Sequence, residues 1–152
     1  MTRVLVLNGP NLGSLGRREP DIYGTASLAD VERTLLARAN ELGVELRCEQ
    51  SNHEGRLLDL LEEEAGRAQG VVVNPGALSH TSIALLDAMR AFPGPVVEVH
   101  ISNIHAREPF RARSRTGAGA RGVVTGLGVY GYALALEAVT RLIAAEQEEP
   151  SA

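Results

Sequence analysis

The chain has 152 residues, of which 44% are hydrophobic, so its length and composition suit one domain with a packed core. Its formal net charge of -4 comes from interspersed acidic and basic side chains without a basic stripe, which predicts no nucleic-acid partner. All 15 positive side chains are arginine, so neither a lysine Schiff base nor a phosphate-loop lysine is available to this protein.

The first part of the chain predicts a strand, a helix and a second strand. Residues 4–7 are apolar and β-branched in part, as in a buried parallel strand. A helix is expected from about Ser27, where Ser27 and Asp30 have capping-box spacing, to Gly43, a typical C-cap glycine. Apolar and polar residues then alternate, which favours a strand nearer the sheet edge. Its Cys48, the one cysteine, excludes an intrachain disulfide and is interpreted as a small buried apolar residue.

The remainder continues this alternation. Apolar runs predict further buried strands at residues 71–73, 96–99 and 123–125. Amphipathic helices are expected at about residues 54–67, after Ser79 and after Gly131. No apolar stretch is long enough for a signal peptide or a membrane span, so a cytoplasmic protein is expected. Residues 148–152 are predicted to form a disordered tail.

Five strands alternating with helices predict an α/β fold, and we expect residues 1–147 to form a single domain. The flavodoxin-like three-layer fold, with a five-stranded parallel sheet of order 2-1-3-4-5, fits this pattern. Ligands of such folds bind beyond the carboxyl ends of the strands. Three strands run there into polar turns, at residues 8–11, 74–76 and 100–103. Their convergence predicts a binding site at this edge of the sheet.

A glycine-rich run at residues 126–131 matches the dinucleotide fingerprint G-x-G-x-x-G and follows a strand. Only one helix remains after it, so no further strand completes the nucleotide-binding unit. The run therefore predicts a tight strand-to-helix turn. A flavodoxin-like module that binds a flavin or a nucleotide remains the alternative function. A signalling receiver domain is not favoured, because Asn8 stands where it needs an acidic cluster and the required lysine is missing.

Two groups of side chains suggest acid–base chemistry. Residues 13–24 are rich in glycine and lack an apolar period, which predicts a mobile lid loop. Tyr23 stands in this loop with arginines, and guanidinium groups favour the phenolate form of a nearby tyrosine. Glu98 and His100 lie two apart on one strand and so share a face. A carboxylate placed there orients an imidazole and favours the charged form that a general acid needs.

Two other chemistries fit the sequence less well. The four histidines lack the paired spacing of known zinc motifs, so no metal site is predicted. No serine stands in a G-x-S-x-G nucleophile elbow, so a serine hydrolase is not favoured.

Short motifs are spread along most of the chain. They are LNGPNLG at residues 7–13, REP at 18–20, YG at 23–24, QSNHEG at 50–55, NPGA at 74–77, EVHISN at 98–103, HARE at 105–108 and GLG at 126–128. In order and spacing they resemble the type II 3-dehydroquinate dehydratase family, from residue 4 to about residue 143. The resemblance implies reversible dehydration of 3-dehydroquinate to 3-dehydroshikimate through an enolate, in the shikimate pathway of aromatic amino acid biosynthesis, with no metal or organic cofactor. The unrelated type I enzymes form a lysine imine, which this chain cannot do.

The resemblance also implies catalytic roles at matching positions. Tyr23 corresponds to the general base that removes a proton from C2 of the substrate. Arg18, on the lid, corresponds to the arginine that favours the tyrosinate, and Asn11 lies in the wall of the same site. His100 corresponds to the general acid that protonates the departing C1 hydroxyl, with Glu98 as its orienting carboxylate.

Further positions correspond to substrate-binding residues. Asn74 matches the residue that binds substrate and helps hold a water near the developing enolate. His80 and Arg111 are expected to hold substrate hydroxyls. The backbone amides of Ile101 and Ser102 are expected to receive the substrate carboxylate.

The resemblance implies an assembly as well. The family forms dodecamers built from trimers, and Asp87 matches an aspartate that reaches a neighbouring subunit's site. Residues 113–119 depart from the family's usual pattern, because they are rich in arginine and glycine. This segment is expected to alter subunit contacts without touching the catalytic set. The sequence leaves open whether the enzyme serves shikimate biosynthesis or quinate breakdown.

Overall fold

The computed structural model describes residues 1–149, which contain a parallel sheet in the order β2-β1-β3-β4-β5. Its strands are β1 (Arg3–Asn8), β2 (Glu45–Gln50), β3 (Gly70–Asn74), β4 (Val96–His100) and β5 (Gly122–Thr125). Every pair of neighbouring strands runs parallel. The flavodoxin-like α/β fold and its strand order are therefore confirmed.

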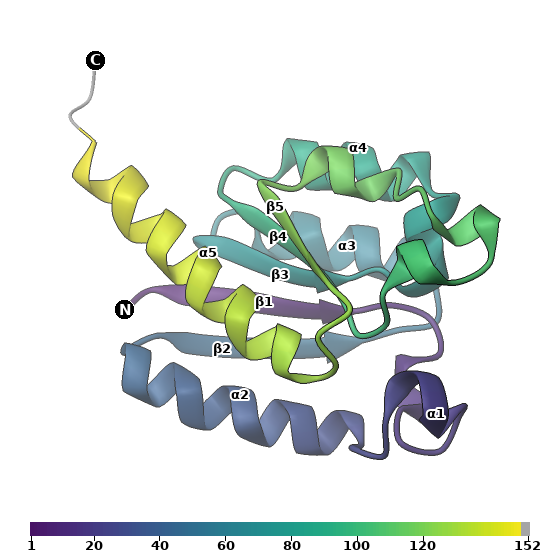
Figure 1. Cartoon of the computed structure of the whole chain (residues 1–152). Coiled ribbons are helices and arrows are strands. Elements are labelled where there is room, and N and C mark those ends of the chain that lie inside the picture. The colour runs from purple at the N-terminus through teal and green to yellow at the C-terminus, as the bar shows by residue number, and fades with distance from the viewer. Residues whose placement is uncertain (150–152) are drawn as a thin grey trace.

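Helices cover both faces of the sheet (Figure 1). One face carries α2 (Leu28–Leu42) and α5 (Tyr130–Glu148), and the other carries α3 (Glu54–Glu64) and α4 (Ile83–Ala91). Successive side chains of a strand point to opposite faces, so β1 contributes to both cores. Val4 and Val6 pack with α2 and α5. Leu5 and Leu7 pack with α3 and α4. The fold thus has the expected three layers.

The ends of α2 agree with the sequence pattern, whereas α3 is shorter than expected. The Ser27 hydroxyl and the Asp30 carboxylate form the predicted capping box, and Gly43 ends α2 in the left-handed conformation, with φ 72°. α3 ends at Glu64 and not at residue 67. The chain turns there because Gly66 follows, and glycine is a poor helix former.

α4 begins later than expected. The residues Gly76–His80 form a 3-10 helix, and α4 starts after Ser82, whose hydroxyl accepts a 2.9 Å hydrogen bond from the Leu85 amide. Both Ser79 and Ser82 are suitable N-cap residues, and the sequence pattern does not distinguish between them. The 3-10 helix carries His80 back toward the carboxyl edge of the sheet.

The two outermost strands differ from the inner ones in burial. β2 lies at one edge, as expected, and its Cys48 is half-buried; burial raises the pKa of this thiol to about 12. β5 was expected to be buried, but it forms the other edge and leaves Val123 45% exposed. That expectation was wrong because a short β-branched run does not reveal whether a strand has neighbours on both sides.

The segment between β1 and α2 contains more regular structure than a loop. It forms a 3-10 helix at Leu12–Ser14 and the short helix α1 (Pro20–Tyr23). At the other terminus, Glu148 is helical, in contrast to the expected start of a disordered tail, and residues 150–152 of that tail lie outside the described residues. Among residues 1–149, no helix combines the length and the apolar composition that crossing a membrane requires.

Candidate active site

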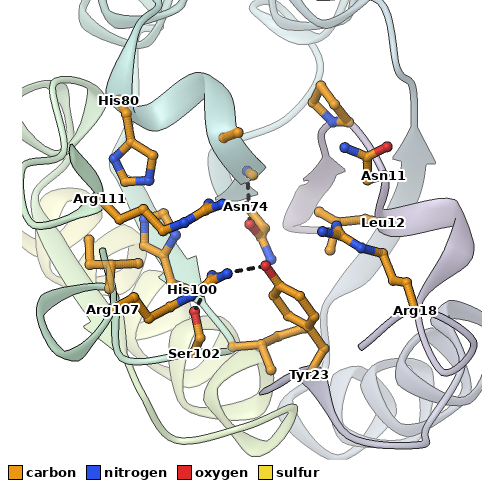
Figure 2. Close-up of a pocket in the computed structure, with 15 residues that line it drawn as sticks. Asn11, Leu12, Arg18, Tyr23, Asn74, His80, His100, Ser102, Arg107 and Arg111 are labelled. Carbon is orange, nitrogen blue, oxygen red and sulfur yellow. Dashed lines mark hydrogen bonds between the residues drawn. The ribbon is translucent and has the colours of Figure 1, made fainter. Parts of the chain in front are cut away.

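A pocket opens at the carboxyl ends of β1, β3 and β4, where the three polar turns were predicted to meet (Figure 2). Most of the predicted site residues line it: Asn11, Arg18, Tyr23, Asn74, His80, His100, Ile101, Ser102 and Arg111. Glu98 lies beneath the pocket, and Asp87 lies exposed on α4 outside its lining. The predicted convergence of the turns is therefore confirmed, whereas the chemical role of each residue stays a prediction.

Two glycines allow the turns after β1 and β3 to touch. The Gly9 amide donates to the Asn74 carbonyl at 2.8 Å, and a Cβ at Gly9 would lie only 2.5 Å from the Pro75 oxygen. Gly76 has φ +60° and would place a Cβ 3.0 Å from the Pro10 oxygen. At Gly9 any larger residue would clash with the turn after β3, and at Gly76 both the close approach and the left-handed backbone require glycine. This contact brings the walls that carry Asn11 and Asn74 together.

Glu98 and His100 form a buried pair on β4. The His100 Nε2 atom lies 2.9 Å from Glu98 Oε2, and Ser114 donates to the same oxygen at 2.7 Å. The Thr116 hydroxyl donates to the other oxygen, Oε1. Burial by itself raises the pKa of Glu98, but the hydrogen bonds from His100, Thr116 and Ser114 outweigh it, so the pKa lies below the usual carboxyl value. The carboxylate is thus held ionised against the imidazole.

Residues 113–119 touch this pair, so the expectation that they avoid the catalytic set was wrong. Ser114 and Thr116 supply the two hydroxyls that bind Glu98. The Arg113 carbonyl lies 2.9 Å from His80 Nδ1. The segment has no strand or helix period from which these contacts could be read, because it consists of irregular backbone followed by one short 3-10 helix at Thr116–Gly119.

The contact between Thr116 and Glu98 predicts a pH-dependent loss of stability. A carboxyl whose pKa is lowered by folding stabilises the protein above its unfolded pKa, and that contribution disappears as the pH falls through the folded pKa. We expect Thr116→Val to lower the free energy of unfolding by about 1.5 to 3 kcal/mol at neutral pH. The difference from wild type should shrink below about pH 4, where Glu98 becomes protonated in the unfolded chain.

Urea denaturation at neutral and at acidic pH measures this difference, and Thr116→Ser is the matched control because it keeps the hydroxyl. The same loss of stability at both pH values in Thr116→Val would contradict the ionic role of the contact.

Two arginines surround Tyr23 (Figure 2). Arg107 Nη1 donates to the Tyr23 hydroxyl oxygen at 2.8 Å and to the Ser102 hydroxyl at 3.1 Å. The Arg18 guanidinium carbon lies 4.6 Å from the centre of the Tyr23 ring. Arg18 also pairs with Glu19 at 3.3 Å. Arg107 is therefore the arginine that reaches the phenol oxygen, where a guanidinium stabilises negative charge best.

Sequence reasoning assigned no role to Arg107. Its position in the HARE motif at residues 105–108 was the available signal, together with the proximity of that motif to the polar turn after β4. The contact joins residues 84 positions apart, so pattern and spacing could not reveal it.

The remaining pocket residues are held by backbone contacts or short side-chain bonds. Asn74 Oδ1 accepts from the Gly76 amide at 3.0 Å, and Arg111 Nε pairs with Glu108. The carbonyl of Ser102 accepts from the Thr125 hydroxyl at 3.0 Å, which ties the turn after β4 to β5.

The glycine-rich run at residues 126–131 forms the predicted tight turn between β5 and α5. Gly126 and Gly128 both have positive φ, of 85° and 64°. A Cβ at Gly126 would lie 2.9 Å from the Asn103 Cβ, so the turn packs closely on the segment after β4. The run thus serves chain reversal and packing. In residues 1–149, no three side chains of the His, Cys, Asp and Glu types cluster as potential metal ligands.

Comparison with known proteins assigns this architecture to a family. The sequence profile of the family described as Dehydroquinase class II matches residues 2–140. The chain belongs to this family. It is 55% identical over 141 residues to 3-dehydroquinate dehydratase 1 of Agrobacterium fabrum, covering 93% of this chain and 97% of the relative. It is 58% identical over 137 residues to 3-dehydroquinate dehydratase of Chelativorans sp., covering 90% and 94%.

Solved structures agree with this assignment. The type II dehydroquinase of Propionibacterium acnes superimposes with a TM-score of 0.89 at 45% identity, covering 93% of this chain and 97% of that one. The type II dehydroquinase of Butyrivibrio crossotus has the same TM-score of 0.89 at 38% identity, covering 91% and 97%. The class II dehydroquinase fold therefore extends over nearly the whole chain.

Proposed function

We propose that this protein is a 3-dehydroquinate dehydratase, a hydro-lyase that converts 3-dehydroquinate reversibly to 3-dehydroshikimate in the shikimate pathway. One observation carries the proposal: the pocket contains both the Tyr23 phenol, hydrogen-bonded to a guanidinium, and the His100 imidazole, hydrogen-bonded to a buried carboxylate. Loss of water beta to a ketone needs a base, stabilisation of an enolate and an acid for the leaving group. The alternative of a flavin or nucleotide module is not favoured, because the run at residues 126–131 is a packing turn.

In the first step, the Tyr23 phenolate removes a proton from C2, and the electron pair of the C2–H bond moves onto the ketone oxygen to form the enolate. Arg107 stabilises the phenolate through its bond to the hydroxyl oxygen, while Arg18 lies over the ring. Asn74 binds the substrate and helps to hold a water beside the developing enolate, and Asn11 forms the adjoining wall.

In the second step, the enolate collapses to the conjugated ketone, the C1–O bond breaks, and His100 protonates the departing hydroxyl as water. The ionised Glu98, 2.9 Å from His100 Nε2, keeps the imidazole oriented. A positioned acid or base of this kind typically contributes about 10²- to 10⁴-fold.

Charge complementarity supports an anionic substrate. The residues that line the pocket include three arginines, Arg18, Arg107 and Arg111, and no aspartate or glutamate. A cleft lined by one sign of charge raises the local concentration of ligands of the opposite sign. We assign the substrate carboxylate to the amides of Ile101 and Ser102, and the substrate hydroxyls to His80 and Arg111.

The assembly, cellular location and domain organisation follow as further proposals. We propose a cytoplasmic dodecamer of four trimers, in which Asp87 reaches the pocket of a neighbouring subunit from the exposed face of α4. Within each subunit, residues 1–147 form one catalytic domain, and residues 13–24 act as its lid. Light scattering on the purified protein measures the mass of the particle and thus tests the stoichiometry.

A direct assay of product tests the proposed activity. Purified protein mixed with 3-dehydroquinate should generate the ultraviolet absorbance of a conjugated enone, without added metal or organic cofactor. The same protein preincubated with a chelator should give the same rate. Absence of the product under conditions in which an authentic dehydratase makes it would contradict the proposal.

A further inference from the structure

A buried tyrosine joins the ends of β1 and β3 beneath the pocket. Tyr132, in the first turns of α5, is 1% exposed and does not line the pocket. Its hydroxyl accepts from Asn74 Nδ2 at 2.9 Å and donates to Asn8 Oδ1 at 2.6 Å. Asn8 and Asn74 end β1 and β3 in register, and both are buried. Three polar side chains are thus bonded in series with very little access to water.

A single backbone amide sets the direction of this series. The Gly76 N–H can only donate, and it donates to Asn74 Oδ1 at 3.0 Å. The Nδ2 end of the Asn74 carboxamide must therefore face Tyr132, whose oxygen accepts. The hydroxyl hydrogen then points to Asn8, which presents its carbonyl oxygen. Burial raises the pKa of Tyr132, so the hydroxyl keeps the proton that this direction requires.

Asn74 is the member of the series that reaches the pocket (Figure 2). A carboxamide can be turned over with almost no change in shape, but its donor and acceptor then exchange places. Two bonds oppose this exchange here: the Gly76 amide at the oxygen and the Tyr132 hydroxyl at the nitrogen. The second hydrogen of Nδ2 and the second lone pair of Oδ1 consequently keep fixed directions.

We infer that Tyr132 is a positioning residue for the proposed dehydration, because its hydroxyl holds the Asn74 carboxamide in the one orientation that presents donor and acceptor to the substrate and its water. The inference rests on the proposed function for its kinetic consequence, and on the hydrogen bonds alone for the orientation of Asn74. It gives α5, on the opposite face of the sheet from α3 and α4, a part in organising the pocket.

Steady-state kinetics of Tyr132→Phe test this role. The variant keeps the ring and removes only the hydroxyl, so we expect kcat/KM for 3-dehydroquinate to fall about 10- to 100-fold, as for the loss of one buried hydrogen bond that orients a reacting group. Tyr130→Phe is the matched control, because Tyr130 is in the same helix and 65% exposed, and it should retain the wild-type kcat/KM. An unchanged kcat/KM in Tyr132→Phe overturns the inference.

A double-mutant cycle separates positioning from a general structural effect. If Tyr132 acts through Asn74, Tyr132→Phe should cause no further fall in kcat/KM once Asn74→Ala is present. Additive losses would mean that the hydroxyl acts on the whole structure, and would overturn the inference. Asn8→Ala provides a second variant: it removes the acceptor of the Tyr132 proton, and its effect should likewise disappear in the Asn74→Ala background.

A readout without substrate distinguishes failure of this inference from failure of the proposed function. In the wild-type protein, the side-chain amide of Asn74 should give two separate NMR proton signals protected from exchange with water. Tyr132→Phe should reduce that protection, whereas Tyr130→Phe should not. Unaltered Asn74 amide signals in Tyr132→Phe overturn the positioning role, whether or not the protein dehydrates 3-dehydroquinate.

Discussion

Replacing Tyr23 with phenylalanine should reduce kcat for 3-dehydroquinate by about 10²- to 10⁴-fold, the usual contribution of one positioned acid–base group. The substitution removes the only atom of this side chain that can take a proton. The ring itself stays in place over Arg18, so substrate binding should change much less than turnover. A fall in kcat with little change in KM is therefore the expected kinetic pattern.

Tyr130→Phe is the control for this substitution, since it removes a hydroxyl from an exposed tyrosine on α5. Stopped-flow or steady-state assays of the ultraviolet product signal measure both variants. Full turnover by Tyr23→Phe would remove Tyr23 from the role of base and leave the pocket without one of the two groups on which the proposed reaction depends.

Arg107→Gln should lower kcat by about 10²- to 10³-fold, comparable to removing one preorganised donor from a site of developing charge. Arg107 donates directly to the Tyr23 oxygen, so its charge is most useful when that oxygen is negative. Arg18→Ala should also reduce turnover strongly, because it removes the second cation that lies beside Tyr23, over its ring.

The comparison of the two arginine variants distinguishes the contact with the oxygen from the contact with the ring. Arg141→Gln serves as the control, because Arg141 is an exposed arginine of α5 outside the pocket lining. If Arg107→Gln turns over substrate at the wild-type rate, the hydrogen bond to Tyr23 has no part in the reaction.

Much of the fold could be predicted because the elements obey local rules. The capping box at Ser27 and the left-handed Gly43 define α2 through contacts a few residues apart. The alternation of strands and helices restricts the topology to few arrangements, and the parallel order was among them. The start of α4 and the exposure of β5 were missed, because they depend on which of two serines caps a helix and on what lies beside a strand.

In the candidate site, too, local contacts could be predicted from the sequence and contacts made by the tertiary fold could not. Glu98 and His100 could be paired from sequence because two residues of one strand must share a face. Arg107, Thr116 and Tyr132 could not be recognised from pattern alone, because each acts on a residue brought near only by the tertiary fold. The sequence around each of these three residues does not indicate which distant side chain it will contact in the folded protein.

Residues 113–116 contact two separate side chains of the site, Glu98 and His80. Their hydroxyls hold Glu98 behind His100, while the Arg113 carbonyl lies 2.9 Å from His80 Nδ1. A displacement of this short stretch would therefore disturb the supports of His100 and His80, two side chains of the pocket, in a single event.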